Sequence, residues 1–278
     1  MRPHFYLLCL AALFPIVVES ATLRVLPGPF ASGKAFLSCT FDGVQQSCFL
    51  DTGSVMTLLA DPDRFSRYPK LGTFRFKSAS GIPKEVETIQ IHTVVIDKVE
   101  FSDTKVGRFQ PDRVADSTIG IDLVGRQPFS VSFRRSPSLH LNPTPPRELS
   151  AELQVDKHRL LSLPIAFDAT ETRAMWDTGS SVTAIDQEFI KAHPEVFKPT
   201  KEFMKGTDGA GDTLLVKVFR AKKITIGPRS FRNVRVVAVD LSLLREKISP
   251  ELHAVIGFNL IRKADWFFDP ENKAWSVR

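Results

Sequence analysis

Residues 48–59 and 174–185 of this 278-residue chain are two versions of one segment, and this repeat constrains the fold more than any other feature. The first reads CFLDTGSVMTLL and the second reads AMWDTGSSVTAI. In each, an apolar, strand-like run leads directly into an aspartate, Asp51 or Asp177, which Thr, Gly and Ser follow. An acid at the end of an apolar run is costly unless it is neutralised, paired or used in chemistry. Each copy therefore carries one candidate functional acid.

The repeat extends well beyond these two segments. With Asp51 placed on Asp177, an offset of 126 residues, residues 37–59 align with the second copy without a gap. The segments ATLRV and AELQV also match, as do DSTIGIDLV and HAVIGFNLI, and the strand-like segments PFSVSF and DWFFD follow the latter pair. A period of this kind indicates a duplicated unit. We therefore predict two copies, at residues 21–136 and 150–278.

The segment between the copies, residues 137–149, contains four prolines and has no helical period. Proline fixes φ and removes a backbone donor, so it is poorly suited to regular secondary structure. We predict an extended Pro-rich linker here rather than another element.

Strand signals dominate both copies. AFLSCTF and QQSCFL flank an Asp42-Gly43 turn, which predicts a hairpin, and TIQIHTVVI and KVFRAKKITI are rich in β-branched residues. The predicted helices are short: GIDLVG, DQEFIKAHP and GFNLIRKAD. The expected fold class is mostly β, with two small lobes.

The first 20 residues are predicted to be a secretory signal peptide. Arg2 and His4 precede an apolar run at residues 5–18, and small residues follow it. Because this run is short for a membrane span, we expect cleavage after Ser20 and export to the periplasm or the cell exterior. An uncleaved membrane anchor is the alternative.

Two of the three cysteines, Cys39 and Cys48, remain after signal removal. In an oxidising compartment they are candidates for one disulfide, with two free buried thiols as the alternative. They lie on the two arms of the predicted hairpin at unequal distances from Asp42-Gly43, so we expect a loop longer than two residues.

Charge and motif patterns argue against several other functions. The formal net charge of +6 comes from residues scattered along the chain, which predicts a solvated basic surface and no nucleic-acid partner. The six histidines form no close metal-ligand pair, and there is no phosphate loop or Gly-x-Ser-x-Gly elbow. We therefore expect neither a metal nor an organic cofactor, and a structural role for His253.

The two Asp-Thr-Gly triplets resemble those of aspartic peptidases. Each is followed downstream by an apolar-apolar-Gly element, Thr118-Ile119-Gly120 or Val255-Ile256-Gly257. The compact copies resemble the retroviral-type (retropepsin-like) branch, duplicated in tandem, over nearly the whole mature chain. The resemblance implies two homologous acid-protease-like β-barrel lobes with an active-site cleft between them. It also implies a monomeric endopeptidase that acts on peptides or proteins as an internal pseudo-dimer.

By this resemblance, Asp51 and Asp177 are the catalytic pair. Peptide hydrolysis without a metal or a nucleophilic side chain needs one group that takes a proton from water and one that gives a proton to the substrate. Two carboxylates sharing one proton supply both functions.

The neighbouring residues acquire supporting roles by the same resemblance. Thr52 and Thr178 would hydrogen-bond across the lobe interface, and Gly53 and Gly179 would permit tight turns with accessible N–H groups. Two pairs behind the triplets would pack against the loops, with the isoleucines near the substrate channel; these are Ile119 with Gly120 and Ile256 with Gly257.

Ser54 and Ser180, the residues after the triplets, are expected to donate to the outer carboxylate oxygens. A donor to a carboxylate favours the ionised form and lowers the pKa of the pair. The sequence therefore predicts an acidic optimum, with hydroxyls bonded to the backbone as the alternative.

Each copy is also expected to carry a hairpin that covers the substrate. The candidates are KSASGIP, with Ser80, Gly81 and Ile82, and KGTDGAGDT, with its central Asp208, Gly209 and Ala210. Neither contains the flap tyrosine of pepsin-like enzymes, which favours a two-flap arrangement. Two other functions remain open: an inactive duplicated β-domain that binds peptide or cell-envelope ligands, and an enzyme that must pair with a second chain.

Overall fold

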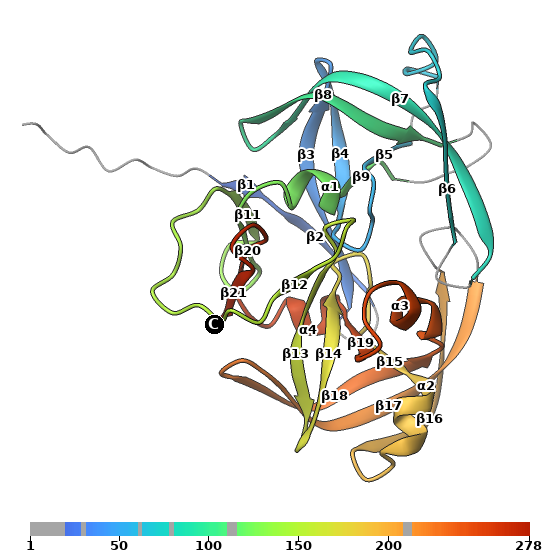
Figure 1. Cartoon of the computed structure of the whole chain (residues 1–278), viewed down its shortest axis with the longest axis vertical. Coiled ribbons are helices and arrows are strands. Elements are labelled where there is room, and N and C mark those ends of the chain that lie inside the picture. Colours follow the sequence, from blue (N-terminus) through green and yellow to red (C-terminus); the bar gives the residue numbers. More distant parts are fainter. Residues whose placement is uncertain (1–19, 29–31, 61–62, 78–80, 110–115, 208–212) are drawn as a thin grey trace, which may run out of the picture.

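The computed structural model describes residues 20–28, 32–60, 63–77, 81–109, 116–207 and 213–278, and the structural statements below concern these residues. They form two β lobes stacked on one another, with the N-terminal lobe coloured blue to green and the C-terminal lobe yellow to red in Figure 1. The predicted signal peptide lies outside the described residues. None of the described helices is long and apolar enough to cross a membrane.

The N-terminal lobe is built on an eight-stranded sheet with the order β2-β3-β4-β9-β5-β8-β7-β6, in which β3 also pairs with β7. Its elements are β2 (Arg24–Pro27), β3 (Gly33–Phe41), β4 (Val44–Asp51), β5 (Leu58–Leu59), β6 (Gly72–Lys77), β7 (Pro83–Ile96), β8 (Val99–Arg108), β9 (Thr118–Gly120) and the helix α1 (Ile121–Val124).

The C-terminal lobe repeats this topology strand for strand, in the order β12-β13-β14-β19-β15-β18-β17-β16, with β13 also paired to β17. Its elements are β12 (Gln154–Val155), β13 (Leu161–Phe167), β14 (Thr170–Trp176), β15 (Ala184–Asp186), α2 (Gln187–Ala192), β16 (Phe197–Thr207), β17 (Thr213–Ile226), β18 (Arg229–Val239), α3 (Ser242–Lys247), β19 (Leu252–Ile256) and α4 (Phe258–Ile261). The predicted duplication and mostly-β fold class are confirmed. The helix α3 was not predicted.

A third sheet joins the lobes, in the order β1-β11-β10-β20-β21. Its strands are β1 (Ala21–Thr22), β10 (Phe129–Ser132), β11 (Ser138–Leu141), β20 (Trp266–Asp269) and β21 (Ala274–Val277). The central pair, β10 with β20, brings together the two segments that follow the repeated apolar-apolar-Gly elements, with Phe129 opposite Phe268. We call this the base sheet.

The base sheet corrects one expectation from the sequence. Ser138–Leu141 lies within the predicted linker but forms strand β11, antiparallel to β10. Leu139 and Leu141 are buried there, which shows why this part of the segment joins the core despite the prolines around it. The remaining prolines, from Pro143 onward, lie outside the strands.

Aromatic side chains fill the space between the base sheet and the second aspartate segment. Trp176 is fully buried and contacts Phe129, Trp266 and Phe268, with ring centroids 6.1, 5.9 and 4.7 Å away. Burial of aromatic rings is a large apolar contribution to stability. This cluster fixes the residue that immediately precedes Asp177.

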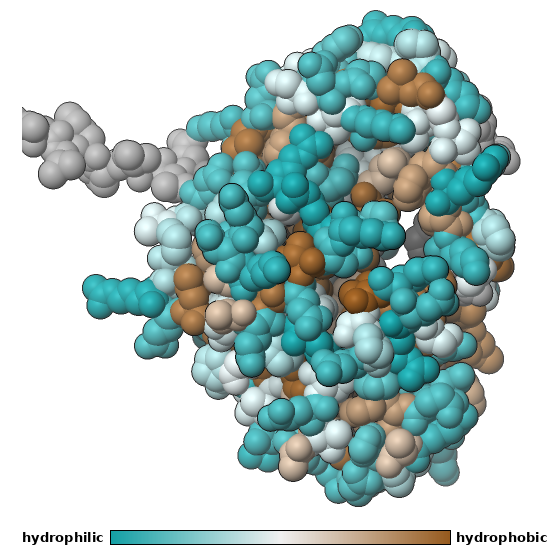
Figure 2. Space-filling view, in the orientation of Figure 1, coloured by the Kyte–Doolittle hydropathy of each residue, from teal (hydrophilic) through white to brown (hydrophobic). Residues whose placement is uncertain are grey.

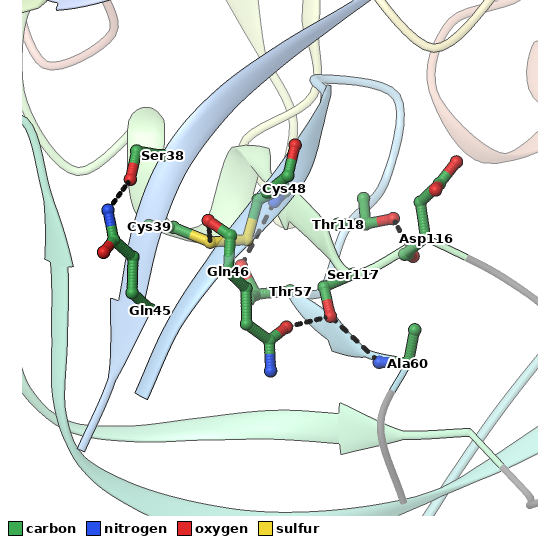
Figure 3. Close-up of a disulfide and its surroundings, with 12 residues drawn as sticks. Ser38, Cys39, Gln45, Gln46, Cys48, Thr57, Ala60, Asp116, Ser117 and Thr118 are labelled. Carbon is green, nitrogen blue, oxygen red and sulfur yellow. Dashed lines mark hydrogen bonds between the residues drawn. A yellow bond between two sulfur atoms is a disulfide. The ribbon is translucent and has the colours of Figure 1, made fainter. Parts of the chain in front are cut away.

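The first hairpin contains the expected disulfide between Cys39 and Cys48, with a Cα–Cα distance of 6.0 Å (Figure 3). The turn has only two residues, Asp42 and Gly43, both with positive φ, so the expected longer loop is wrong. The register explains the difference. Cys39 pairs with Gln46 and Cys48 pairs with Leu37, so the disulfide joins diagonal rather than directly opposite positions.

Two long hairpins, β6–β7 and β16–β17, extend along one side of the molecule toward the boundary between the lobes (Figure 1). The space-filling view shows an opening between the lobes on that side (Figure 2). The end of β6 lies near the C-terminal lobe. This proximity is seen in the pKa of Glu246 on α3, which is lowered mainly by Lys247 and, to a smaller extent, by the charge of Lys77 of β6.

Candidate active site

Asp51 is the last residue of β4, and Asp177 directly follows β14. Each of these strands pairs in parallel with the strand that carries the apolar-apolar-Gly element, so Leu50 lies beside Ile119 and Trp176 beside Ile256. The apolar residues before each acid are thus interior strand residues. This local structure delivers both carboxyl groups to the boundary between the lobes.

Two threonines connect the aspartate loops across the boundary. The N–H of Thr52 donates to Oγ1 of Thr178, and the N–H of Thr178 donates to Oγ1 of Thr52, both at 3.0 Å. The hydroxyls donate onward to the opposite strands, Thr178 to the carbonyl of Leu50 at 2.7 Å and Thr52 to that of Trp176 at 3.3 Å. Both threonines are completely buried. The loops therefore hold one another in a nearly symmetric arrangement.

The glycines of the triplets are required by the close approach of the opposite acid. A Cβ on Gly53 would lie 2.5 Å from the carboxyl carbon of Asp177, and a Cβ on Gly179 would clash with the carboxyl group of Asp51. Glycine therefore does more than allow a tight turn. Each one leaves room for the carboxyl group of the other lobe.

The two carboxyl groups form one coupled pair. The N–H groups of Gly53 and Ser54 donate to Oδ1 of Asp51 at 3.0 and 3.1 Å, and that of Gly179 donates to Oδ1 of Asp177 at 2.8 Å. The acids also hydrogen-bond to one another. Burial, followed by the charge of Asp177, raises the pKa of Asp51 to about 8. Burial also raises the pKa of Asp177, which its backbone donors and Asp51 oppose.

This electrostatic arrangement favours a proton shared by the two acids. A neutral Asp51 can donate to Asp177, which is the direction in which the hydrogen bond favours the charged form of Asp177. Burial of both acids and their mutual repulsion therefore favour a pair that holds one proton. Such a pair offers a proton acceptor and a proton donor at the same place.

The expected role of the two serines is wrong. The hydroxyl of Ser54 donates to the carbonyl of Met56 at 2.8 Å, and that of Ser180 donates to the carbonyl of Val182 at 3.0 Å. Short polar side chains often bond to nearby backbone in this way. Their N–H groups, rather than their hydroxyls, face the acids. The predicted acidic optimum therefore loses its physical basis.

The isoleucines of the apolar-apolar-Gly elements lie in the interior of the lobes. Ile119 and Ile256 are fully buried behind the loops. Because side chains alternate along a strand, the preceding residues, Thr118 and Val255, point to the opposite face. The expected place of the isoleucines near the substrate channel stays a prediction.

The glycines after these isoleucines bond to residues that the sequence analysis left without a role. The N–H of Gly120 donates to the hydroxyl of Thr57 at 3.1 Å, and that of Gly257 donates to Thr183 at 3.2 Å. A usable signal was present, because the two threonines occupy equivalent positions of the repeat within otherwise apolar runs.

Two of the flap candidates lie within the described residues. Gly81 and Ile82 are exposed between β6 and β7, and Gly81 has a positive φ. Ser80, Asp208, Gly209 and Ala210 lie outside the described residues. Their role in covering a substrate stays a prediction.

His253, for which the sequence predicts a structural role, lies against a buried acid of the C-terminal lobe. His253 contacts the buried Asp186, with 3.4 Å between Nδ1 and Oδ2, and stacks on Phe189. Within the described parts of the chain, no group of three or more His, Cys, Asp or Glu residues is arranged to hold a metal ion.

Comparison with known proteins supports the same fold. The family model described as "Aspartyl protease" matches residues 163–260, within the C-terminal lobe. The chain is similar to the crystal structure of an aspartic proteinase from Irpex lacteus, with 13% sequence identity and a TM-score of 0.59, over 93% of this chain and 96% of that one. No curated protein sequence matches the chain. The molecule therefore has the two-lobed fold of aspartic proteinases, with two structurally equivalent lobes contributed by one chain.

Proposed function

We propose that this protein is an aspartic endopeptidase that hydrolyses peptide bonds with a water molecule activated between Asp51 and Asp177. The observation that carries the proposal is the coupled pair of carboxyl groups, one from each lobe, held by the reciprocal threonine bonds. The fold and the family-model match both favour a peptidase.

In the proposed reaction, the ionised Asp177 takes a proton from the water as it attacks the scissile carbonyl. The neutral Asp51 gives a proton to the carbonyl oxygen, which becomes a hydroxyl in the tetrahedral intermediate. As the C–N bond of the intermediate breaks, Asp177 gives its proton to the leaving amine nitrogen, and Asp51 takes a proton from a hydroxyl of the intermediate, which becomes the product carboxylic acid. The pair returns to its singly protonated form, so no metal or organic cofactor is needed.

The decisive experiment compares Asp51→Asn and Asp177→Asn in a peptidase assay on a mixed peptide library. Neither lobe holds a complete acid-base pair, so each substitution should lower kcat/KM by about 10²–10⁴-fold or more. Asp168→Asn, an exposed turn residue nine positions before Asp177, is the matched control and should retain activity. Substantial hydrolysis by either purified dyad variant would overturn the proposal. An inactive wild type that binds peptides would favour the alternative of a non-cleaving β-domain.

Inhibitors give an independent test. A peptide analogue with a hydroxyl group in place of the attacked carbonyl should inhibit, because it resembles the tetrahedral state. Chelators should leave the rate unchanged. Strong inhibition by a chelator would instead indicate metal-dependent hydrolysis.

The pH dependence follows from the dyad. Activity requires one proton in the pair, and the pKa of Asp51 is raised to about 8. We expect substantial activity at neutral pH and a decline above about pH 8, which replaces the acidic optimum expected from the serines. A pH-rate profile whose alkaline limb already reaches zero activity below neutral pH would contradict this assignment.

The location and the assembly of the protein are part of the proposal. The apolar run at residues 5–18 supports export to the periplasm or the cell exterior. Because both acids come from one chain, a monomer supplies a complete site. Sedimentation of the active form should give one 31.1 kDa chain, slightly less after signal removal, whereas an active species found only as a dimer would contradict it.

A further inference from the structure

The loop of Asp51 is held in place through an acidic side chain outside the dyad. The hydroxyl of Thr57 accepts from the N–H of Gly120 at 3.1 Å and donates to Oδ1 of Asp122 at 2.9 Å. The N–H of Thr57 also bonds to Asp122. Close by, the N–H of Ile121 donates to the carbonyl of Ser54 at 2.9 Å. Asp122 is therefore the final acceptor in a chain of bonds that fixes residues 54–57.

The C-terminal lobe contains the same arrangement with an amide in place of the acid. Oδ1 of Asn259 accepts from both the N–H and the hydroxyl of Thr183, each at 2.8 Å. The N–H of Phe258 donates to the carbonyl of Ser180 at 2.7 Å. The amide nitrogen of Asn259 donates to the carbonyl of Arg235 at 2.9 Å. This support is complete and uncharged at every pH.

Asp122 lies at a place where its charge is costly. Its side chain is half-buried, and burial raises its pKa above the ordinary value. Arg126 opposes this effect, with its Nε donating to the Asp122 carbonyl at 2.9 Å and its guanidinium over Phe101 of β8. From the C-terminal lobe, Arg159 donates to the carbonyl of Gly125 at the end of α1. Asp51 is the titratable group of the loop itself.

We propose that Asp122 is a positioning residue for the Asp51 loop, and that protonation of its carboxyl group loosens this loop while the equivalent Asn259 keeps the Asp177 loop fixed at all pH values. The proposal rests on the proposed function of Asp51. An ionised carboxylate is the stronger acceptor for the two Thr57 donors, and it weakens as the acid is protonated. The raised pKa brings this change nearer to neutral pH than for an ordinary aspartate.

Protonation of Asp122 should lower activity but raise the stability of the fold. Because the pKa of Asp122 is raised on folding, the fold favours its neutral form. The wild type should therefore lose stability as pH rises from about 4 through the raised pKa. Asn at position 122 stays neutral, so it should remove that part of the pH dependence.

The experiment uses Asp122→Ala, Asp122→Asn and the reciprocal Asn259→Asp in the full chain. We expect Asp122→Ala to lower kcat about 10–100-fold, because small misplacements of a catalytic group are costly. Asp122→Asn should recover most of that loss and move the acidic limb of kcat to lower pH. Asn259→Asp should lower the melting temperature at neutral pH, because a carboxylate cannot donate to the Arg235 carbonyl.

The melting temperature of Asp122→Asn measured from pH 4 to pH 8 separates this proposal from the proposed function. One outcome is an inactive wild type together with a melting temperature that depends less on pH in Asp122→Asn than in the wild type. This outcome would overturn the peptidase assignment and support a titrating Asp122. A melting temperature with the same pH dependence in the wild type and in Asp122→Asn would overturn the present proposal, whatever the activity. An Asp122→Ala variant with kcat within twofold of wild type would also overturn it.

Discussion

The two lobes have the same topology but are stabilised by different interactions. In the N-terminal lobe, the hairpin that leads into Asp51 carries the Cys39–Cys48 disulfide. The equivalent residues of the C-terminal lobe are Ile165 and Ala174, which occupy the same diagonal register and are buried. A covalent bond in one lobe thus takes the place of an apolar contact in the other.

The C-terminal lobe has a buried ion-pair cluster of its own just before α2. Asp186 is buried and contacts Arg245 of α3 at 3.3 Å and His253 of β19 at 3.4 Å. The equivalent position of the N-terminal lobe is Ala60, whose N–H bonds to Ser117. Both copies therefore share the aspartate loops and the strand order. The disulfide and the buried ion pairs that stabilise the surrounding structure differ between them.

The largest stability effect in this comparison is expected at Asp186. Its substitution by Ala leaves Arg245 and His253 without their buried partner, and loss of one member of a buried ion pair costs about 3–5 kcal/mol. Because Arg245 is partly exposed, the lower end of that range is expected. Urea unfolding of Asp186→Ala measures it.

The control for Asp186→Ala is the same substitution in an Arg245→Leu background. The cost should be smaller there, because the cation that needed the partner is gone. Equal costs in both backgrounds would show that Asp186 stabilises the lobe by other contacts.

The next effect is that of the disulfide. Replacing Cys39 with Ile and Cys48 with Ala installs the pair found in the C-terminal lobe, and should cost about 2–3 kcal/mol because so short a loop contributes little closure entropy. Thermal unfolding with and without reductant measures the cost. Reductant should have no effect on the variant.

The reciprocal change sharpens this result. Cysteines at positions 165 and 174 occupy the same register and should form a disulfide of similar value. Failure of this bond to form in protein exported to an oxidising compartment would show that the two hairpins are not interchangeable.

The smallest effect is expected from electrostatics within the dyad. The pKa of Asp51 is raised to about 8, so its contribution to stability is fully present below about pH 4 and is lost as pH rises through 8. Asp177→Asn removes the neighbouring charge that helps to raise the pKa of Asp51, so it should stabilise the protein relative to the wild type near pH 8. Near pH 4 the gain should vanish. A gain that is independent of pH would indicate a packing effect.

The repeat alone was sufficient to predict the two lobes, because an offset alignment relates whole strands and their turns. It also brought Asp51 and Asp177 into equivalent positions, and the structure places their loops together. The Cys39–Cys48 disulfide was predictable from two cysteines on adjacent arms of one hairpin. These features depend on periodicity and spacing, which a sequence displays directly.

Other features depend on which partner lies within about 3 Å, and residue type does not decide that. The hydroxyls of Ser54 and Ser180 had two acceptors available, a carboxylate and a nearby carbonyl, and the local turn selected the carbonyl. The hydrogen bond between Thr57 and Asp122 was hidden because the two residues are 65 positions apart in the sequence. Strand β11 was missed because neighbouring prolines masked a short buried segment.

The base sheet has a consequence for how the two lobes could be separated. The start of each repeat pairs with a strand of the base sheet, Ala21–Thr22 with β11 and Ser150 with Trp275 of β21. Cleavage of the chain between residues 143 and 148 would therefore break no strand pairing. The two fragments would keep a complete set of complementary edges, and their reassembly would become dependent on concentration, as in a heterodimer.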